Sequence, residues 1–143
     1  MDESTAKLLQ ECHLGCHMAI GSMEQILGLV YNRELKETIR NYEKEHRAIY
    51  QKTGELLKKD GRTGKKPGNI ASAMAWFTTE MKMMADGSSH QAASIMTDGC
   101  NMGIKSISEY RNQYQDASAQ SLKLADQIIA SEESFMKDLR KFM

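Results

Sequence analysis

The sequence predicts an all-α fold, a four-helix bundle with a short fifth helix in the crossover between the second and third long helices. Three observations predict it. The chain holds one proline and only 6% aromatic residues, whereas strands are enriched in aromatic and β-branched side chains. Apolar residues recur in alternating steps of three and four, which is the period of an amphipathic helix. Glycine and capping residues divide the chain into four segments of about 25 to 27 residues and one shorter segment.

Length and composition are those of one domain. The chain has 143 residues, of which 41% are hydrophobic and 27% charged. These values are ordinary for a globular domain and too apolar for a disordered tail. We therefore expect residues 1–143 to form a single helical domain.

Charge and hydropathy exclude several classes of partner. Lys plus Arg equals Asp plus Glu at 19 each, so no excess of positive charge attracts a phosphate backbone and we expect no nucleic-acid partner. No stretch approaches the roughly 20 apolar residues of a membrane span, so we expect no membrane partner. The start of the chain lacks a signal sequence, and the three cysteines do not form an even-numbered disulfide framework. The expected location is the cytoplasm.

The first two long helices are predicted at residues 4–30 and 33–59. Asn32 is a suitable N-cap for the second, and the short connection makes the two antiparallel neighbours. The inward stripe of the first helix consists of Leu9, Cys12, Cys16, Ala19, Met23, Ile26 and Val30. That of the second consists of Leu35, Ile39, Tyr42, His46, Ile49, Thr53 and Leu56.

A glycine-rich basic segment at residues 60–68 separates this pair from the rest. It resembles a phosphate-binding loop only superficially, because no Ser or Thr follows its lysines and no strand precedes it. We interpret it as a solvated connection. The crossover helix is expected at residues 69–85, and Ser88 to Gln91 form a capping box for the next helix.

The last two long helices are predicted at residues 89–114 and 118–142. Asp116 and Ser118 favour a turn between them, since such side chains cap helices. The alternative is one uninterrupted helix of about 50 residues, because no glycine or proline lies beyond Ile104. Gly99 and Gly103 on the third helix are expected to allow close helix approach.

Two helix pairs joined by a helical crossover resemble the ferritin-like superfamily, and most closely its small bacterial members of unknown function. The resemblance covers nearly the whole chain and includes one local motif. Glu43-Lys44-Glu45-His46 matches the Glu-x-x-His of the family's second helix. In metal-binding members, the resemblance implies carboxylates on the first and third helices and Glu-x-x-His on the second and fourth.

The sequence departs from this ligand pattern. Cysteines stand on the first and third helices where the family has carboxylates. On the fourth helix, Glu132 and Glu133 are followed three residues later by Phe135 and Met136 instead of histidine. The full di-iron oxidase set is therefore absent, no catalytic residue is predicted, and a binding or structural role is favoured over an enzyme.

A metal site at the middle of the bundle is nevertheless predicted. Counting about 1.5 Å per residue along each helix places four residues of the inward stripes at heights of ~18 to ~22 Å. They are Cys16, His46, Cys100 and Glu132. Cys12 lies one turn below Cys16 and Glu43 one turn above His46, and they extend the candidate set. Thiol, imidazole and carboxylate groups suit tetrahedral zinc or a single iron, so the expected cofactor is iron or zinc.

A metal-free alternative stays open. Free cysteine packs as a small hydrophobe, and a histidine on a core stripe is often a satisfied structural residue. The protein would then be a structural or interaction bundle, for example a homodimer through the crossover face. His13 and His17 are spaced to chelate a metal but are expected to flank the stripe at the bundle boundary. The 11 methionines are expected to fill the core.

Overall fold

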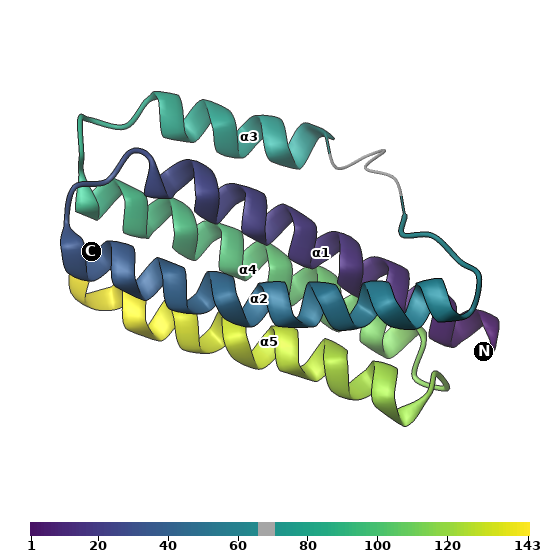
Figure 1. Ribbon diagram of the computed structural model, residues 1–143. Coiled ribbons are helices and arrows are strands. Elements are labelled where there is room, and N and C mark those ends of the chain that lie inside the picture. The colour runs from purple at the N-terminus through teal and green to yellow at the C-terminus, as the bar shows by residue number, and fades with distance from the viewer. Residues whose placement is uncertain (66–70) are drawn as a thin grey trace.

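The computed structural model describes residues 1–65 and 71–143, and it shows four long helices packed as a bundle with a fifth helix on the outside (Figure 1). The helices are α1 (Glu3–Leu27), α2 (Arg33–Lys59), α3 (Ala71–Lys82), α4 (Ser89–Gln113) and α5 (Ala119–Leu139), followed by the 3₁₀ turn η1 (Arg140–Phe142). The predicted all-α bundle with a crossover helix is confirmed. No helix in the described ranges combines the length and apolar character needed to cross a membrane.

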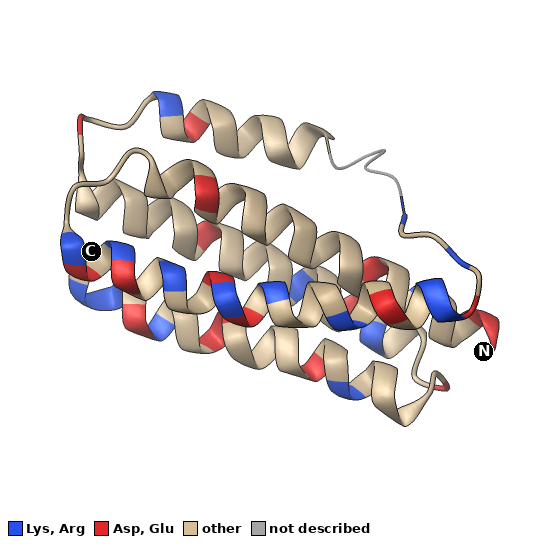
Figure 2. Cartoon of the chain, in the orientation of Figure 1, with Lys and Arg blue, Asp and Glu red and all other residues tan. Residues whose placement is uncertain are grey.

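The chain returns across the bundle through α3. Helices α1 and α2 pair closely, as do α4 and α5, and α3 lies along α1 and α4 (Figure 1). It leads the chain from the end where α2 finishes to the end where α4 begins. Charged residues follow the outer faces of α2 and α5, whereas α3 carries only Glu80 and Lys82 (Figure 2). The charged residues of the bundle are thus concentrated on α2 and α5 rather than on the crossover helix.

Side-chain caps fix the predicted helix starts. The Asn32 side chain accepts a hydrogen bond from the Leu35 N–H at 2.9 Å, and the Ser88 hydroxyl accepts one from the Gln91 N–H at 3.2 Å. These bonds satisfy N–H groups that have no partner within the first helical turn.

The turn between α4 and α5 is confirmed, and the continuous helix is excluded. Ser118 caps α5 by accepting a hydrogen bond from the Ser121 N–H at 3.2 Å. Its own N–H donates to the Thr5 hydroxyl at 2.8 Å, which fastens the turn to α1. Ser118 thus gives the backbone a hydrogen-bonding partner where α4 does not continue into α5.

Three predicted helix ends differ from the structure. Helix α5 ends at Leu139 rather than at residue 142, because its last turn tightens into the 3₁₀ turn η1. Helix α1 ends at Leu27 rather than at residue 30, because Gly28 caps it and Val30 pairs with Gly87 in an isolated bridge. Helix α3 ends at Lys82 rather than at residue 85, before a turn in which Gly87 has a φ of 70°. A positive φ is readily adopted by glycine, so Gly87 fixes this turn. The expected start of the crossover helix at residue 69 and the end of the basic connection at residues 66–68 lie outside the described residues.

The buried residues form two clusters along the bundle. The cluster at the α1–α2 turn consists of Met23, Ile26, Val30, Leu35, Ile39, Tyr42, Phe77, Met81, Ala92, Ala93, Ile95, Met96, Cys100, Phe135 and Leu139. The cluster at the opposite end consists of Leu8, Leu9, Cys12, Cys16, Ile49, Leu57, Ile107, Ala117, Leu124, Ala125 and Ile128. His46 on α2 and Glu132 on α5 fall between the two clusters in the order of each helix. They form a polar layer at mid-height.

Candidate functional site

The polar layer consists of one imidazole and one carboxyl group that face each other. His46 Nε2 lies 3.6 Å from Glu132 Oε1, and the exposed fractions of the two side chains are 0% and 8%. Each lies on the inward stripe of its helix, His46 between Tyr42 and Ile49 on α2, so helical periodicity directs it to the core. The predicted meeting of these two residues is confirmed.

Hydrogen bonding sets the tautomer of His46. Its Nδ1 lies 2.8 Å from the backbone oxygen of Tyr42. A carbonyl oxygen only accepts, so Nδ1 carries the proton and Nε2 of the neutral ring is an acceptor. Within the described residues neither this Nε2 nor Glu132 Oε2 has a hydrogen-bond partner. Leaving a buried polar group unpaired costs about 1–3 kcal/mol, so the two atoms are candidates for binding a ligand.

Gly103 on α4 makes room for the carboxyl group. A Cβ added at this position would lie 2.6 Å from Glu132 Oε1 and closer still to Oε2. Burial raises the pKa of Glu132, and the neighbouring His46 offsets part of that rise. Gly99, one turn away, instead receives the ring of Phe77 from α3. The two glycines thus let α3 and α5 approach α4 closely, each by admitting one side chain of the neighbouring helix.

The three thiols lie around this layer without forming a disulfide. Burial is the main cause that raises the pKa of Cys12 to about 12 and that of Cys16 and Cys100 well above the ordinary thiol value. The charge of Glu132 raises the pKa of Cys16 and Cys100 further. At neutral pH all three are thiols rather than thiolates, which makes them weak nucleophiles and weak metal ligands.

The predicted metal set is only partly assembled. Glu43 lies away from the layer and pairs with Arg47, its Oε2 being 3.1 Å from the Arg47 Nη2. Cys12 lies in the core cluster at the far end, next to Cys16. In residues 1–65 and 71–143 no group of three or more His, Cys, Asp or Glu side chains is arranged to hold a metal ion. His46 and Glu132 thus fit a metal as a partial ligand set.

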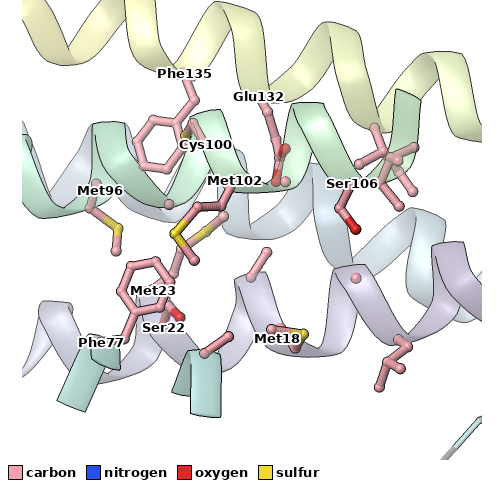
Figure 3. Close-up of a pocket in the computed structure, with 18 of the residues that line it drawn as sticks. Met18, Ser22, Met23, Phe77, Met96, Cys100, Met102, Ser106, Glu132 and Phe135 are labelled. Carbon is pink, nitrogen blue, oxygen red and sulfur yellow. The ribbon is translucent and has the colours of Figure 1, made fainter. Parts of the chain in front are cut away.

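A pocket of about 270 Å³ opens between α1 and α4 beneath α3, and Glu132 lies in its wall (Figure 3). Apart from the carboxyl group the wall is mainly apolar. Its larger side chains include Met18, Met23, Phe77, Met96, Met102, Ile107 and Phe135. Small residues line it on both helices, namely Gly15, Ala19 and Ser22 on α1 and Gly99, Gly103 and Ser106 on α4. We call this space, with these residues, the α1–α4 pocket.

Sequence reasoning did not predict the pocket. The missed signal is the row of small residues Gly15, Ala19 and Ser22 at helical spacing on α1, opposite Gly99 and Gly103 on α4. Rows of small residues also occur where two helices pack in close contact. A pocket can therefore be distinguished from such a contact only when the positions of the helices are known.

His13 belongs to a separate cluster. It is half-buried, its ring stacks on Tyr50 at a centroid distance of 4.1 Å, and its Nδ1 lies 3.0 Å from the Thr53 hydroxyl. His17 is exposed at the same edge. Both flank the inward stripe of α1 at the bundle boundary, as predicted.

Comparisons with known proteins establish the fold alone. No protein-family model and no curated protein sequence matches the chain. A solved structure with a similar fold is the crystal structure of a DUF305 fragment from Deinococcus radiodurans, with a TM-score of 0.78 and 12% sequence identity. The alignment covers 98% of this chain and 95% of that chain. This likeness supports the predicted resemblance at the level of helical architecture.

Proposed function

We propose that the protein is a binding protein that holds a small, mainly apolar molecule in the α1–α4 pocket. The observation that carries the proposal is a pocket of about 270 Å³ between α1 and α4, covered by α3 and lined mainly by apolar side chains. Interiors of small domains are packed nearly as densely as organic crystals, and voids larger than a water molecule are few. A few larger residues on α1 or α4 would close this space and stabilise the fold.

The lining suits an adaptable apolar ligand. Methionines Met18, Met23, Met96 and Met102 have three rotatable bonds and a polarisable sulfur, so they adjust to the shape of a bound molecule. An engineered apolar cavity of about 150 Å³ takes one benzene. By that measure, 270 Å³ takes a ligand of roughly 11 non-hydrogen atoms.

Binding of n-butylbenzene tests the proposal. The single tryptophan, Trp76, contacts Phe77 in the pocket wall edge to face at 5.0 Å, so its emission reports on the pocket. We expect n-butylbenzene to change Trp76 emission saturably and to raise the melting temperature, because a ligand that binds only the folded state stabilises it.

Two alanine-to-phenylalanine variants control this experiment. Ala19→Phe fills the pocket from α1 and should abolish the response while the far-ultraviolet circular dichroism stays helical. Ala48→Phe adds the same ring at an exposed position of α2 outside the pocket and should respond like the wild type. No saturable response in the wild type, or equal responses in all three proteins, would overturn the proposal.

Metal binding at the polar layer is a second candidate, favoured by the unpartnered His46 Nε2 and Glu132 Oε2. A complete site would add Cys16 or Cys100 as a thiolate, which a bound zinc or iron ion would favour by displacing the thiol proton. Elemental analysis of untagged protein purified without chelators tests it. Near-stoichiometric zinc or iron that is lost in His46→Ala supports the site, and protein that refuses both added metals rules it out.

A further inference from the structure

The acidic group in the wall of the α1–α4 pocket has no basic counterpart there. The lining contains two acidic side chains, Glu11 and Glu132, and no Lys, Arg or His. Glu11 is already paired, since its Oε1 lies 2.6 Å from Lys65 Nζ. Glu132 is therefore the acidic group of this lining with no Lys or Arg partner; its one basic neighbour is His46, which lies outside the lining and faces Oε1.

The free oxygen of Glu132 is the one available to a ligand. Oε1 faces His46 Nε2 at 3.6 Å, whereas Oε2 has no hydrogen-bond partner among the described residues. Figure 3 shows Glu132 reaching into the pocket from α5. The side chain is more than nine-tenths buried, so bulk water does not compete freely for Oε2.

The groups around Glu132 accept hydrogen bonds more readily than they donate them. His46 on α2 cannot satisfy Oε2 in either protonation state. When neutral it uses its one ring proton, on Nδ1, for Tyr42, and when protonated it directs the Nε2 proton to Oε1. Cys16 on α1 and Cys100 on α4, the other titratable groups near Glu132, offer only weak S–H donors. A ligand that forms a hydrogen bond with Glu132 Oε2 must bring an N–H or O–H donor. A positive charge on that donor would complement the carboxylate.

We propose that the ligand of the α1–α4 pocket is a small hydrophobic amine, whose ammonium group binds Glu132 Oε2 and whose apolar body lies among the methionines and Phe77. This inference rests on the proposed function and names the class of its ligand. An ammonium carries three N–H donors, and its charge-assisted hydrogen bond to a carboxylate is about twice as strong as a neutral one. The aromatic ring of Phe77 and the thioethers of the methionines supply apolar contacts for the rest of the molecule.

Three probes of the same shape separate charge from apolar burial. They are 4-phenylbutylamine, 4-phenylbutan-1-ol and 4-phenylbutanoate, titrated calorimetrically at pH 7. We expect the amine to bind the wild type about tenfold or more tightly than the alcohol, and the carboxylate to bind most weakly. Glu132→Gln keeps the side-chain shape and should remove the advantage of the amine while leaving the alcohol affinity within about threefold.

Neighbouring variants control the test. Glu133→Gln makes the same change at an exposed position beside the site and should keep the full preference for the amine. Gly103→Ala leaves the charge of Glu132 in place but forces its carboxyl group out of position, and it should weaken amine binding most. Circular dichroism confirms that each variant is folded.

The outcomes distinguish this inference from the proposed function. If n-butylbenzene and the alcohol bind but the amine has no advantage, or if the advantage survives in Glu132→Gln, the amine assignment is overturned and the pocket remains a binding site. If none of the three probes and no n-butylbenzene binds, both proposals fail.

Discussion

The bundle has two seams of opposite character, one between α2 and α5 and one between α1 and α4. In the first, large side chains meet: Tyr42 stacks on Phe135 at a centroid distance of 4.7 Å, and its hydroxyl donates a hydrogen bond to Asp138. In the second, Ala19 and Ser22 on α1 face Gly99 and Gly103 on α4, and the space between them stays open as the α1–α4 pocket. The first seam is closed by its own residues and the second is covered by α3.

The difference shows how one small bundle separates stability from binding. The closed seam buries aromatic surface, which contributes strongly to folding free energy. The open seam has fewer packing contacts between its two helices. It is covered on the outside by α3, in which only Phe77 and Met81 are buried. Substitutions in the closed seam should therefore destabilise the whole protein. Substitutions in α3, which we call the cover, should alter access to the α1–α4 pocket.

The largest expected effect comes from truncating one phenylalanine in each region. Phe135→Ala removes a ring that is 1% exposed in the closed seam and should lower the free energy of unfolding by about 3–5 kcal/mol. Phe77→Ala removes a ring that is 6% exposed beneath α3, and we expect a loss of about 1–2 kcal/mol because the cover can detach while the bundle stays folded. Urea denaturation followed by circular dichroism measures both.

Trp76 supplies the second readout for this pair. In Phe77→Ala the tryptophan loses its edge-to-face partner and its emission should shift towards that of exposed indole, with little loss of helicity. In Phe135→Ala the emission should change only when the whole bundle unfolds. Equal losses of stability in the two variants would show that α3 is an integral part of the core.

A smaller effect is expected from adding a methyl group at two glycines of the open seam. In Gly99→Ala the new Cβ would lie 2.9 Å from Phe77 Cε1 and closer still to Cζ, so the ring and α3 must shift. We expect a loss of about 1–3 kcal/mol. In Gly15→Ala the Cβ would lie 3.2 Å from the terminal carbon of Ile107, which can move.

Gly15→Ala is therefore the matched control. The gain in helix propensity on replacing glycine by alanine is about 1 kcal/mol and should offset the tighter contact. Thermal unfolding with Trp76 emission distinguishes the two variants, since only Gly99→Ala should release the tryptophan. A stable Gly99→Ala protein with unchanged emission would mean that Phe77 does not anchor the cover.

The architecture could be predicted because it follows from local rules. Apolar periodicity gave each helix its buried face, and Asn32, Ser88 and Ser118 supplied starts that the structure retains. The ends of α1, α3 and α5 were placed three residues too late. Gly28 caps α1 before the apolar pattern fades, α3 gives way to a turn after Lys82, and α5 tightens into a 3₁₀ turn after Leu139.

The polar layer could be predicted in part. His46 and Glu132 lie on inward stripes at similar heights, so rise per residue alone brought them together. Glu43 did not join them. Its carboxylate pairs with Arg47, one turn further along the surface of α2, instead of turning towards the core. The pocket could not be predicted, because it arises where small residues of α1 lie opposite small residues of α4. That pairing depends on how the two helices are placed relative to each other.

The smallest effect concerns Glu132, which, like Phe135, faces α2 and also lines the α1–α4 pocket. Its pKa is raised by burial above the ordinary value of 4.5, so the folded protein holds the proton more tightly than the unfolded chain. The protonated Glu132 side chain makes its full contribution to the free energy of unfolding below pH 4.5. That contribution is lost as the pH rises through the pKa of the folded state. We expect Glu132→Gln to gain stability relative to the wild type as the pH rises over that range.

Urea denaturation at several pH values, with Glu133→Gln as the matched exposed control, measures this difference. Glu133→Gln should follow the wild type, because the change lies on the surface. A difference between wild type and Glu132→Gln that does not vary with pH would show that His46 fully compensates the buried charge. In that case the carboxyl group would be held by His46 through Oε1. A pH-dependent difference would instead mean that His46 compensates the charge only in part, so that the carboxyl group can bind a ligand in the α1–α4 pocket.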